Sequence, residues 1–589
     1  MKPLISIVIP VYNQLEYTMQ CLESLNAYTK EPHEVIIVDN GSTDGTMEYM
    51  QAESFKHPEY IYVRNEKNLG CAGAYKLGCQ MAQGQYLAIL NNDIVLSREW
   101  SKGLIDCIEA TPNAGLVGAR TNFISGPQMV TEVGLGYSDM FAYQEFAGDF
   151  RTSFKGLYTP YWQIRPFCGM IKKSVYDSVE GFDPRYFPAN CEDDDLCMQL
   201  VLTGYRNMIC GDVFVHHHGC KSQPNDIQTQ EGAARYKMQT DRMYAIWEKK
   251  WVKKGTISAC MIVKNEEHNM KRCIENLLPY VDEIIIVDTG SKDKTVEIAS
   301  SYSKVKVSHF KWIDDFSAAR NFANDQASGD WILSVDADEV FTGLDKLFKY
   351  LLPFHAYRIC TRNYTTNVQY SNITFNHGEH PDHEKGAGWF PSTKIRLFPN
   401  RKDVRWEYPV HEVVEESIYP LGMGIKEEKE CVVHHWSRVD DTKYMGDRSE
   451  KYFELLKKNA ANGKRDLRCL EQLAVQAQGM KKYDEAEGFW MEVLALDPMG
   501  GLVPLNMCHI SAERGNWNLA KEWATKAFLL NPDNKDVNQN MALCCYNTGD
   551  YLMAEKLAKG LLSKEPMNPL GKALLKAIIE LKKTNILGG

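Results

Sequence analysis

Acidic side chains follow two of the hydrophobic runs in this chain, where they could hold a metal ion. The segment VDAD places Asp336 and Asp338 two residues apart after an apolar run. A turn there can aim both carboxylates at one hard cation, and oxygen ligands suit Mg²⁺ or Mn²⁺ bridging to a pyrophosphate. The earlier segment NND leaves Asp93, preceded by Asn92, as the carboxylate that aligns with Asp338. We therefore predict a divalent metal held by Asp93 and another held by Asp338.

Histidine runs later in the chain could complete these metal sites. His216, His217 and His218 follow the run GDVFV, and His434 begins the pair HH after the run CVV. A neutral imidazole at the end of a strand can bind a divalent cation. The sequence leaves open which ring of each run faces the metal, and hydrogen-bonded structural histidines are the alternative.

Further polar residues end the first strands that the apolar runs predict. Ligands of open α/β sheets bind beyond the carboxyl ends of the strands, so these positions predict contacts with a nucleotide. Turn or cap roles are the alternative. Neither GxGxxG nor GxxxxGK[ST] follows the first strand, which argues against dinucleotide-dependent oxidoreductases and P-loop phosphotransferases. The predicted contacts are Pro10, Tyr12, Asn13, Asp39, Val263, Asn265, Glu266 and Asp288.

The elements that position these residues occur twice. ISIVIPVYN at 5–13 is echoed by ISACMIVKN at 257–265, and VIIVDNGSTDGT at 35–46 by IIIVDTGSKDKT at 284–295. GQYLAILNNDIV at 84–95 corresponds in the same order to GDWILSVDADEV at 329–340. Short apolar runs alternate with helical stretches, which is typical of β-α-β units. We predict two α/β domains in tandem, each a Rossmann-like, mostly parallel sheet.

The C-terminal part has a different repeat, in which equivalent residues stand 34 positions apart. An aromatic residue, a small alanine and a proline recur in three registers, the pattern of stacked helix pairs. We predict an all-α solenoid that begins near residue 466 and ends in the helix KALLKAIIELKK. The three registers are Tyr483, Trp517 and Tyr551; Ala486, Ala520 and Ala554; and Pro498, Pro532 and Pro566.

Length and composition agree with several folded domains. The 589 residues include 12 Trp, 30 Tyr and 22 Phe, which is too many aromatics for a mostly disordered chain. A net charge of -10 disfavours nucleic acid as a partner. Without a signal pattern, a membrane-span run or CxxC pairs, we expect a cytoplasmic protein with reduced cysteines. The expected boundaries are 1–220 for the first α/β domain, 221–255 for a linker with a helix, 256–440 for the second domain, 441–465 for a connecting helix and 466–589 for the repeats.

These motifs resemble two branches of the inverting family 2 glycosyltransferases, which have the GT-A fold. The first copy is similar to the rhamnosyltransferase-type branch in ISIVIPVYN, VIIVDNGSTDGT, NLGCAGAYKLG, LNNDIV and GFDPRYFPANCEDDDLCMQLVLTGYR. The second resembles the branch often joined to tetratricopeptide repeats, in CMIVKNEE, EIIIVDTGSKDKT, DDFSAARNFA, DADE, RLFPNR and YPVHE. The C-terminal helix pairs resemble tetratricopeptide repeats themselves.

The resemblance assigns catalytic roles. It places the base of the first copy at Asp193, in a like-charge cluster at a helix start that can raise a carboxyl pKa. The second copy lacks EDxDL, and its base is expected from Glu412 or His411 in YPVHE. Arg320 is expected near the pyrophosphate, with a structural ion pair as the alternative. Asn68 and Gly70, in a turn that permits close backbone approach, are expected near the ribose or phosphates, as are Asn92 and Asp336.

The implied protein is a bifunctional enzyme that transfers sugars from nucleotide-diphosphate sugars, in successive additions. UDP is the default nucleotide, and dTDP and GDP stay open. The repeats favour a protein or peptide acceptor, and a saccharide or a lipid-linked glycan is the alternative. One copy could instead be a non-catalytic pseudo-enzyme, or the chain a nucleotidyltransferase, although no basic Gly-rich first turn supports the latter. The sequence leaves the oligomeric state open.

Overall fold

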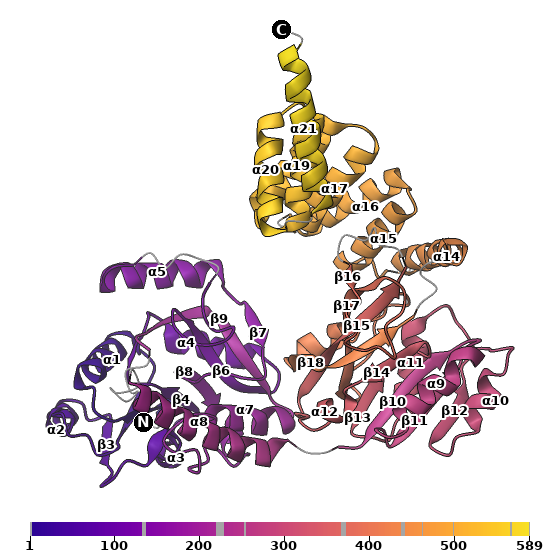
Figure 1. Cartoon of the computed structure of the whole chain (residues 1–589). Coiled ribbons are helices and arrows are strands. Elements are labelled where there is room, and N and C mark those ends of the chain that lie inside the picture. The colour runs from indigo at the N-terminus through magenta and orange to yellow at the C-terminus, as the bar shows by residue number, and fades with distance from the viewer. Residues whose placement is uncertain are drawn as a thin grey trace. The chain divides into compact units, whose positions relative to one another are not determined.

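The computed structural model describes residues 3–131, 137–219, 229–252, 255–366, 373–436, 442–461, 463–498, 500–565 and 568–587 (Figure 1). It divides into two compact units. The first, which carries both sheets, comprises residues 1–312, 317–407 and 413–436. The second comprises residues 313–316, 408–412 and 437–589.

The first sheet is built from the first copy of the repeated blocks. Its strand order is β3-β2-β1-β4-β8-β6-β9-β5, and β7 pairs with β9 at the side. The strands are β1 (Ile5–Val11), β2 (His33–Asp39), β3 (Tyr60–Arg64), β4 (Tyr86–Leu90), β5 (Ile94–Val95), β6 (Ala114–Thr121), β7 (Tyr158–Pro160), β8 (Cys168–Lys172) and β9 (Arg206–His217). The helices are α1 (Leu15–Tyr28), α2 (Thr46–Lys56), α3 (Gly70–Met81), α4 (Trp100–Ala110), α5 (Met140–Ser153), α6 (Lys173–Tyr176) and α7 (Glu192–Leu202).

The second sheet repeats this topology strand for strand. Its order is β12-β11-β10-β13-β17-β15-β18-β14, and β16 pairs with β17. The strands are β10 (Ile257–Val263), β11 (Glu283–Asp288), β12 (Val305–His309), β13 (Trp331–Ser334), β14 (Glu339–Thr342), β15 (His355–Thr365), β16 (Thr374–Phe375), β17 (Gly388–Pro399) and β18 (Gly424–His435). The helices are α9 (Glu267–Leu277), α10 (Thr295–Ser300), α11 (Phe316–Asn324), α12 (Leu344–Leu347), α13 (Glu415–Ile418) and the short η1 (Tyr419–Leu421).

The expectation of two α/β domains followed by helices is confirmed, although the sheets are mixed. β1 and β2 are parallel, and most of their residues are apolar and buried. β8 inserts antiparallel to both β4 and β6. β17 does the same between β13 and β15. The apolar runs before Asp93 and Asp338 therefore lie beside an antiparallel neighbour, and such a partner leaves no distinct pattern in a fully buried strand.

The two domains also share internal hydrogen bonds at the amino ends of their strands. Ser6 Oγ donates to Glu34 Oε1 at 2.5 Å, and Ser258 Oγ donates to Glu283 Oε1 at 2.7 Å. Ser6 Oγ also accepts the backbone N–H of Gly84 at 2.7 Å, and Ser258 Oγ accepts that of Gly329 at 2.9 Å. Equivalent buried polar contacts at equivalent positions show that the sequence repeat is also a structural repeat.

Helix α8 (Gln230–Trp251) follows the first sheet, and consecutive helices form the second unit. Each aromatic of the 34-residue register begins the second helix of a pair: Tyr483 begins α16, Trp517 begins α18 and Tyr551 begins α20. Pro566 lies outside the described residues. The helices are α14 (Thr442–Ala461), α15 (Leu467–Gly479), α16 (Tyr483–Leu496), α17 (Leu502–Glu513), α18 (Trp517–Leu530), α19 (Lys535–Asn547), α20 (Tyr551–Lys564) and α21 (Pro569–Leu587).

The alanines of the repeat register mark the closest helix contacts. Ala486, Ala520 and Ala554 are all fully buried. We expect Ala520→Leu to lower the free energy of unfolding of the repeats by about 1 to 3 kcal/mol, because a larger side chain must push the helices apart. Chemical denaturation followed by circular dichroism measures this. Ala512 is partly buried, so Ala512→Leu is not a suitable control. Leu552 is 83% exposed, and Leu552→Ala is the change that we expect to be nearly neutral.

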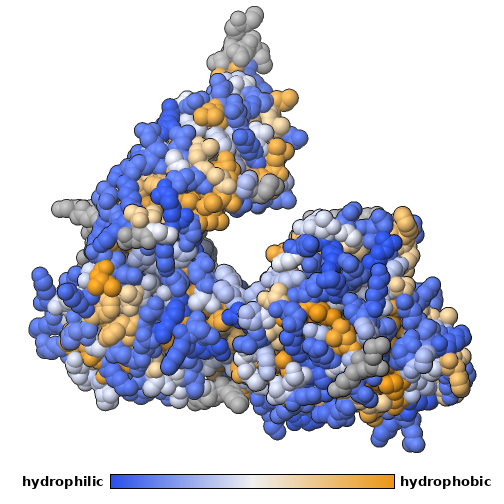
Figure 2. All heavy atoms as spheres, turned by 180° about the vertical axis from the view of Figure 1, so that it is seen from behind, coloured by the Kyte–Doolittle hydropathy of each residue, from blue (hydrophilic) through white to orange (hydrophobic). Residues whose placement is uncertain are grey.

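The surface drawn in Figure 2 is largely hydrophilic, with apolar side chains in patches. All cysteines that the structure describes are free, and most of them are buried. Among the described helices, none combines the length and the apolar character that crossing a membrane requires.

Candidate functional site

The turns after β1 and β2 interlock in the same way in both domains. Asn13 has a φ of 56°, and its side-chain oxygen accepts the backbone N–H of Thr43 at 2.8 Å. Its own backbone N–H donates to Ser42 Oγ at 2.8 Å. Asp39 Oδ1 accepts the backbone N–H of Ser42 at 2.8 Å. The left-handed conformation suits an asparagine, whose amide can bond to nearby backbone.

The second domain reproduces this turn. Asn265 has a φ of 57°, accepts the backbone N–H of Lys292 at 2.8 Å and donates its own N–H to Ser291 Oγ at 2.9 Å. Asp288 accepts the N–H of Ser291 at 3.0 Å. Both aspartates are therefore engaged within their turns, where they shape the loop that follows the strand. Their contact with a nucleotide stays a prediction.

Asp93 faces one of the three consecutive histidines. His217 Nε2 lies 3.3 Å from Asp93 Oδ1, and both side chains are buried. Burial alone raises the pKa of Asp93, but the hydrogen bond and charge of His217 outweigh it and the pKa is lowered. Neighbouring residues of a strand point to opposite sides, so His216 turns away and meets the hydroxyl of Tyr137 at 2.6 Å. The ring of His218 lies 5.0 Å from that of Tyr17.

Asp338 forms the same pair with His435, the second histidine of the HH run. His435 Nε2 lies 3.2 Å from Asp338 Oδ2, and this carboxylate raises the pKa of His435 against the opposing effect of burial. His434 is fully buried and bonds instead to the hydroxyls of Tyr364 at 2.9 Å and Thr342 at 3.1 Å. The geometry thus favours His435 over His434 as the partner of Asp338.

Strand register explains why His217 and His435 are equivalent. In the first domain Ile94, directly after Asp93, pairs with His217 across β5 and β9. In the second, Glu339, directly after Asp338, pairs with His435 across β14 and β18. A two-residue run such as HH cannot reveal this register, because a shift by one residue exchanges the faces of the strand.

Asp336, the other carboxylate of the VDAD segment, pairs with arginines of the protein. Arg320 lies 2.7 Å from Asp336 Oδ1, and the buried Arg396 lies 3.5 Å from Oδ2. Burial opposes ionisation, but the two guanidinium groups hold the pKa of Asp336 well below its usual range. The first domain has the neutral Asn91 here, which accepts the hydroxyl of Tyr75 at 2.9 Å. Each domain therefore keeps one aspartate–histidine pair. Where the second domain has the ion-paired Asp336, the first has the neutral Asn91.

Arg320 makes the structural ion pair that the sequence analysis gave as the alternative to a pyrophosphate contact. Its guanidinium also stands 5.1 Å from the Trp406 ring, and the side chain is almost fully buried. A contact of Arg320 or Asp336 with a nucleotide sugar stays a prediction. Arg396, which the sequence prediction passed over, bonds to the buried Glu339 beside Asp338.

Asp193 lies in the first turn of α7 and is held by an arginine. Arg165 Nη1 stands 2.7 Å from Asp193 Oδ2 and 2.9 Å from Asp194 Oδ1. Burial, followed by the charge of Asp193, raises the pKa of the adjacent Glu192 to about 8. The cluster therefore contains two carboxylates that share one arginine and a third, Glu192, whose pKa is raised. Arg165 lies 28 residues before Asp193, and no motif in the sequence indicated it.

The carboxylates of α7 and of the NND segment converge on the start of α3. Burial raises the pKa of the Cys71 thiol, and the charges of Glu192, Asp193 and Asp93 raise it further. Glu192 and Asp193 of α7 and the distant Asp93 thus all lie near enough to Cys71 for their charges to act on its thiol.

Gly70 permits a close backbone approach within the protein. Its φ is +75°, and a Cβ there would lie 2.7 Å from the carbonyl oxygen of Pro188. The close backbone approach is therefore to the 187–188 segment that leads into α7. Asn68 accepts the N–H of Gly70 at 2.7 Å and closes the turn. Nearness of this turn to a ribose or to phosphates stays a prediction.

The remaining predicted contacts occupy strand ends and first helical turns. Pro10 lies in β1, Tyr12 just beyond it is 45% exposed, and Val263 ends β10. Asn92 donates to Thr18 Oγ1 at 3.0 Å. The backbone N–H of Glu266 donates to Thr295 Oγ1 at 2.7 Å.

His411 and Glu412 belong to the second compact unit. Within that unit Val410 is fully buried in the hydrophobic core of the first repeats. Tyr408 donates its hydroxyl to Asp466 Oδ2 at 2.9 Å, and the His411 ring lies 5.8 Å from that of Tyr452. The role of His411 or Glu412 as a base stays a prediction.

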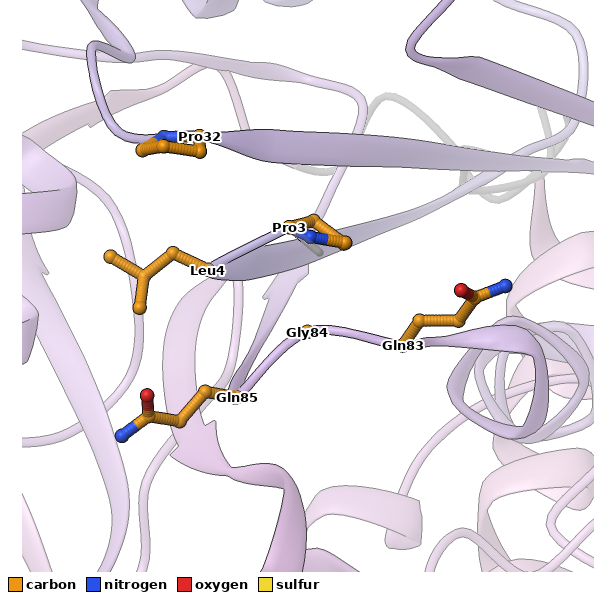
Figure 3. Close-up of a pocket in the computed structure, with 6 residues that line it drawn as sticks. All are labelled: Pro3, Leu4, Pro32, Gln83, Gly84 and Gln85. Carbon is orange, nitrogen blue, oxygen red and sulfur yellow. The ribbon is translucent and has the colours of Figure 1, made fainter. Parts of the chain in front are cut away.

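A cavity of about 550 Å³ lies away from these residues (Figure 3). It opens at the amino ends of β1 and β4, opposite the edge that carries Asp39 and Asp93, so we do not assign the nucleotide to it. Its lining residues are Pro3, Leu4, Pro32, Gln83, Gly84 and Gln85.

Comparison with known families decides the class of protein. A family model described as glycosyl transferase family 2 matches residues 6–175 and again 258–402, together more than half of the chain. The chain belongs to glycosyltransferase family 2. The first matched segment runs from β1 to β8 and the second from β10 to β17, and each includes its NND or VDAD segment.

Two curated relatives of this family 2 chain illustrate the range of similarity. A TPR repeat-containing protein of Synechococcus elongatus is 37% identical over 168 residues, which cover 28% of this chain and 37% of the relative. Glycosyltransferase GlyG of Streptococcus pneumoniae serotype 4 is 26% identical over 208 residues, 34% of this chain and 64% of the relative. The chain thus spans less than two thirds of the length of either relative.

Among solved structures, a mannosyltransferase of Pyrobaculum calidifontis in complex with GDP-Man and Mn²⁺ is 18% identical. The similarity covers 42% of this chain and 65% of that one, with a TM-score of 0.30.

Proposed function

We propose that this family 2 chain is a bifunctional inverting glycosyltransferase that adds sugars from nucleotide-diphosphate donors in two successive steps. One observation carries the proposal: both sheets place an aspartate against a histidine at the same register position, Asp93 with His217 and Asp338 with His435. A pseudo-enzyme domain has no need to keep this pair. Asn91, which stands at the position equivalent to Asp336, removes only an internal ion pair.

A divalent metal fits these pairs. Within the described residues no group of three or more His, Cys, Asp or Glu side chains could hold a metal ion alone. Mg²⁺ and Mn²⁺ commonly bind through one or two protein groups together with substrate phosphates, so one aspartate and one histidine are enough in each domain. When bound, the metal would neutralise charge on the departing nucleoside diphosphate.

In the first domain Asp193 is the proposed base. Inversion requires a single displacement in which an acceptor hydroxyl loses its proton as the bond to the anomeric carbon forms. Arg165 Nη1 lies 2.7 Å from Asp193 Oδ2 and orients this carboxylate, and burial raises the pKa of the adjacent Glu192 to about 8. For the second transfer the proposed base is Glu412, or His411, of the YPVHE segment.

The acceptor is proposed to be a protein or peptide that the repeats recruit, with a saccharide or lipid-linked glycan as the alternative. Stacked helix pairs offer an extended surface of the kind that binds peptides. Presentation of one acceptor to two sites on one chain accounts for successive additions.

Donor turnover tests the proposal. The full chain should release a nucleoside diphosphate from UDP-, dTDP- or GDP-sugars in the presence of Mn²⁺ or Mg²⁺, and EDTA should stop the release. Absence of both turnover and binding for every donor would contradict a transferase function.

A further inference from the structure

Helix α8 connects the two sheets in sequence, but its last turns are built into the first domain. Met243 is fully buried and Trp247 is 8% exposed. Both belong to the hydrophobic cluster that contains Tyr186 and Leu196 of the first domain. A spacer helix would keep a polar surface all round, whereas this one buries a face.

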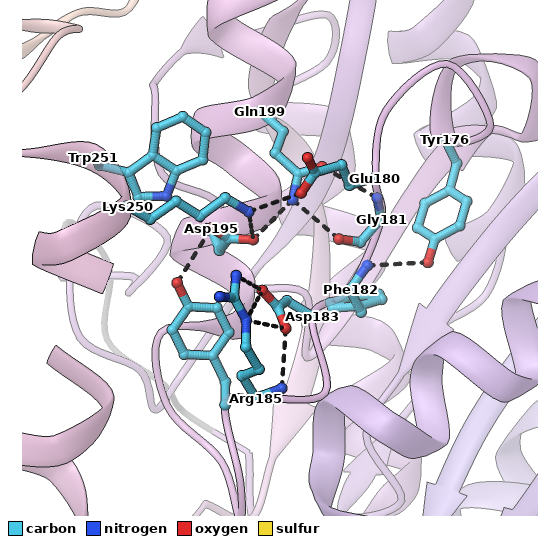
Figure 4. A network of polar contacts seen from close by, with 11 residues as sticks. Tyr176, Glu180, Gly181, Phe182, Asp183, Arg185, Asp195, Gln199, Lys250 and Trp251 are labelled. Carbon is cyan, nitrogen blue, oxygen red and sulfur yellow. Dashed lines mark hydrogen bonds and ion pairs between the residues drawn. The ribbon is translucent and has the colours of Figure 1, made fainter. Parts of the chain in front are cut away.

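The end of α8 meets a carboxylate of the acidic cluster. Asp195 is fully buried, and each of its oxygens accepts two donors (Figure 4). Trp251 Nε1 donates to Oδ1 at 2.7 Å and Lys250 Nζ to Oδ2 at 3.0 Å. The other two donors are Tyr186 at 3.2 Å and Gln199 at 2.8 Å, both from the first domain.

These bonds act on the turn that carries the proposed base. Asp193, Asp194 and Asp195 occupy the first turn of α7. Arg165 holds the turn through Asp193 and Asp194. On its other side, Lys250 at the end of α8 forms an ion pair with Asp195 at 3.0 Å. The direction of Asp193 therefore depends on both attachments.

We propose that Lys250 and Trp251 are positioning residues for Asp193, so that the end of α8 completes the first transferase site. This rests on the proposed function of the first domain. A first domain that ends at residue 220, as the sequence predicted, would lack both donors and leave the Asp195 carboxylate buried without a cation, which is costly.

Two variants of the full-length protein test the proposal. Trp251→Phe keeps an aromatic ring but removes the N–H, and Lys250→Met keeps an aliphatic stem but removes the charge. Both are made in the Asp338→Asn background, so that only the first domain turns over, and release of nucleoside diphosphate is followed with the best donor. We expect kcat to fall about tenfold in each variant, with KM for the donor unchanged and the pH profile of kcat shifted.

Controls separate positioning from unfolding. Lys237→Met, on an exposed stretch of α8 where Lys237 pairs with Asp241, should leave kcat unchanged. Lys250→Arg should restore part of the rate. The same variants in the Asp93→Asn background report the second domain, which should keep its activity and its melting temperature.

The outcomes are distinct. An active parent whose kcat and pH profile do not change in either variant overturns this inference alone. A fall in kcat that accompanies an equal loss of folded protein, or of second-domain activity, also overturns it, because the role is then structural. If the full-length protein without substitutions turns over no donor, the proposed function fails and this inference fails with it.

Discussion

Asp93→Asn should lower the kcat of the first sugar transfer by a factor of about 10² to 10³, and Asp338→Asn should do the same to the second transfer alone. Each domain offers a divalent metal one carboxylate that no arginine neutralises, Asp93 or Asp338. At the other position Asn91 is neutral, and Asp336 is neutralised by Arg320 and Arg396. Loss of that charge leaves a single imidazole in the site. Mass spectrometry of the glycosylated acceptor, or donor turnover where the acceptor is unknown, separates the two effects.

Matched controls lie on each domain. Asp106, exposed and paired with Lys102, and Asp325, exposed and paired with Arg405, make the same change in charge outside the sites. Their Asn variants should retain both transfers. If either Asp93→Asn or Asp338→Asn leaves both sugar additions intact, the corresponding domain is not catalytic and the pseudo-enzyme alternative holds for it.

Asp193→Asn should lower the kcat of the first transfer by about 10² to 10⁴, with little change in KM for the donor. The amide keeps the size of the side chain and can still accept a bond from Arg165, but it cannot take a proton. Asp193 is not among the residues proposed to bind the nucleotide sugar, so isothermal titration calorimetry should show an unchanged affinity.

Two neighbouring carboxylates sharpen this experiment. Asp194→Asn alters the other partner of Arg165 and should cost less activity than Asp193→Asn. Glu192→Gln tests the rival base, because the pKa of Glu192 is raised to about 8 by burial and by Asp193. An active Asp193→Asn together with an inactive Glu192→Gln would transfer the role of base to Glu192.

The fold followed from local patterns. The apolar runs of β1 and β10 and each unit of the 34-residue register are contained in one stretch of chain. Strand and helix periodicities depend on nearest neighbours along the sequence, so they can be read without coordinates. The same holds for the repetition that predicted two equivalent domains.

The sequence by itself determined the two α/β domains, the helical repeats and the aspartates that directly precede β5 and β14. Only the tertiary structure decided that His435 rather than His434 meets Asp338, that Arg320 serves Asp336, and that Asp195 accepts from the end of α8. Strand register and ion pairs join residues tens of positions apart, and their geometry depends on the packing of the whole domain, which no local pattern records.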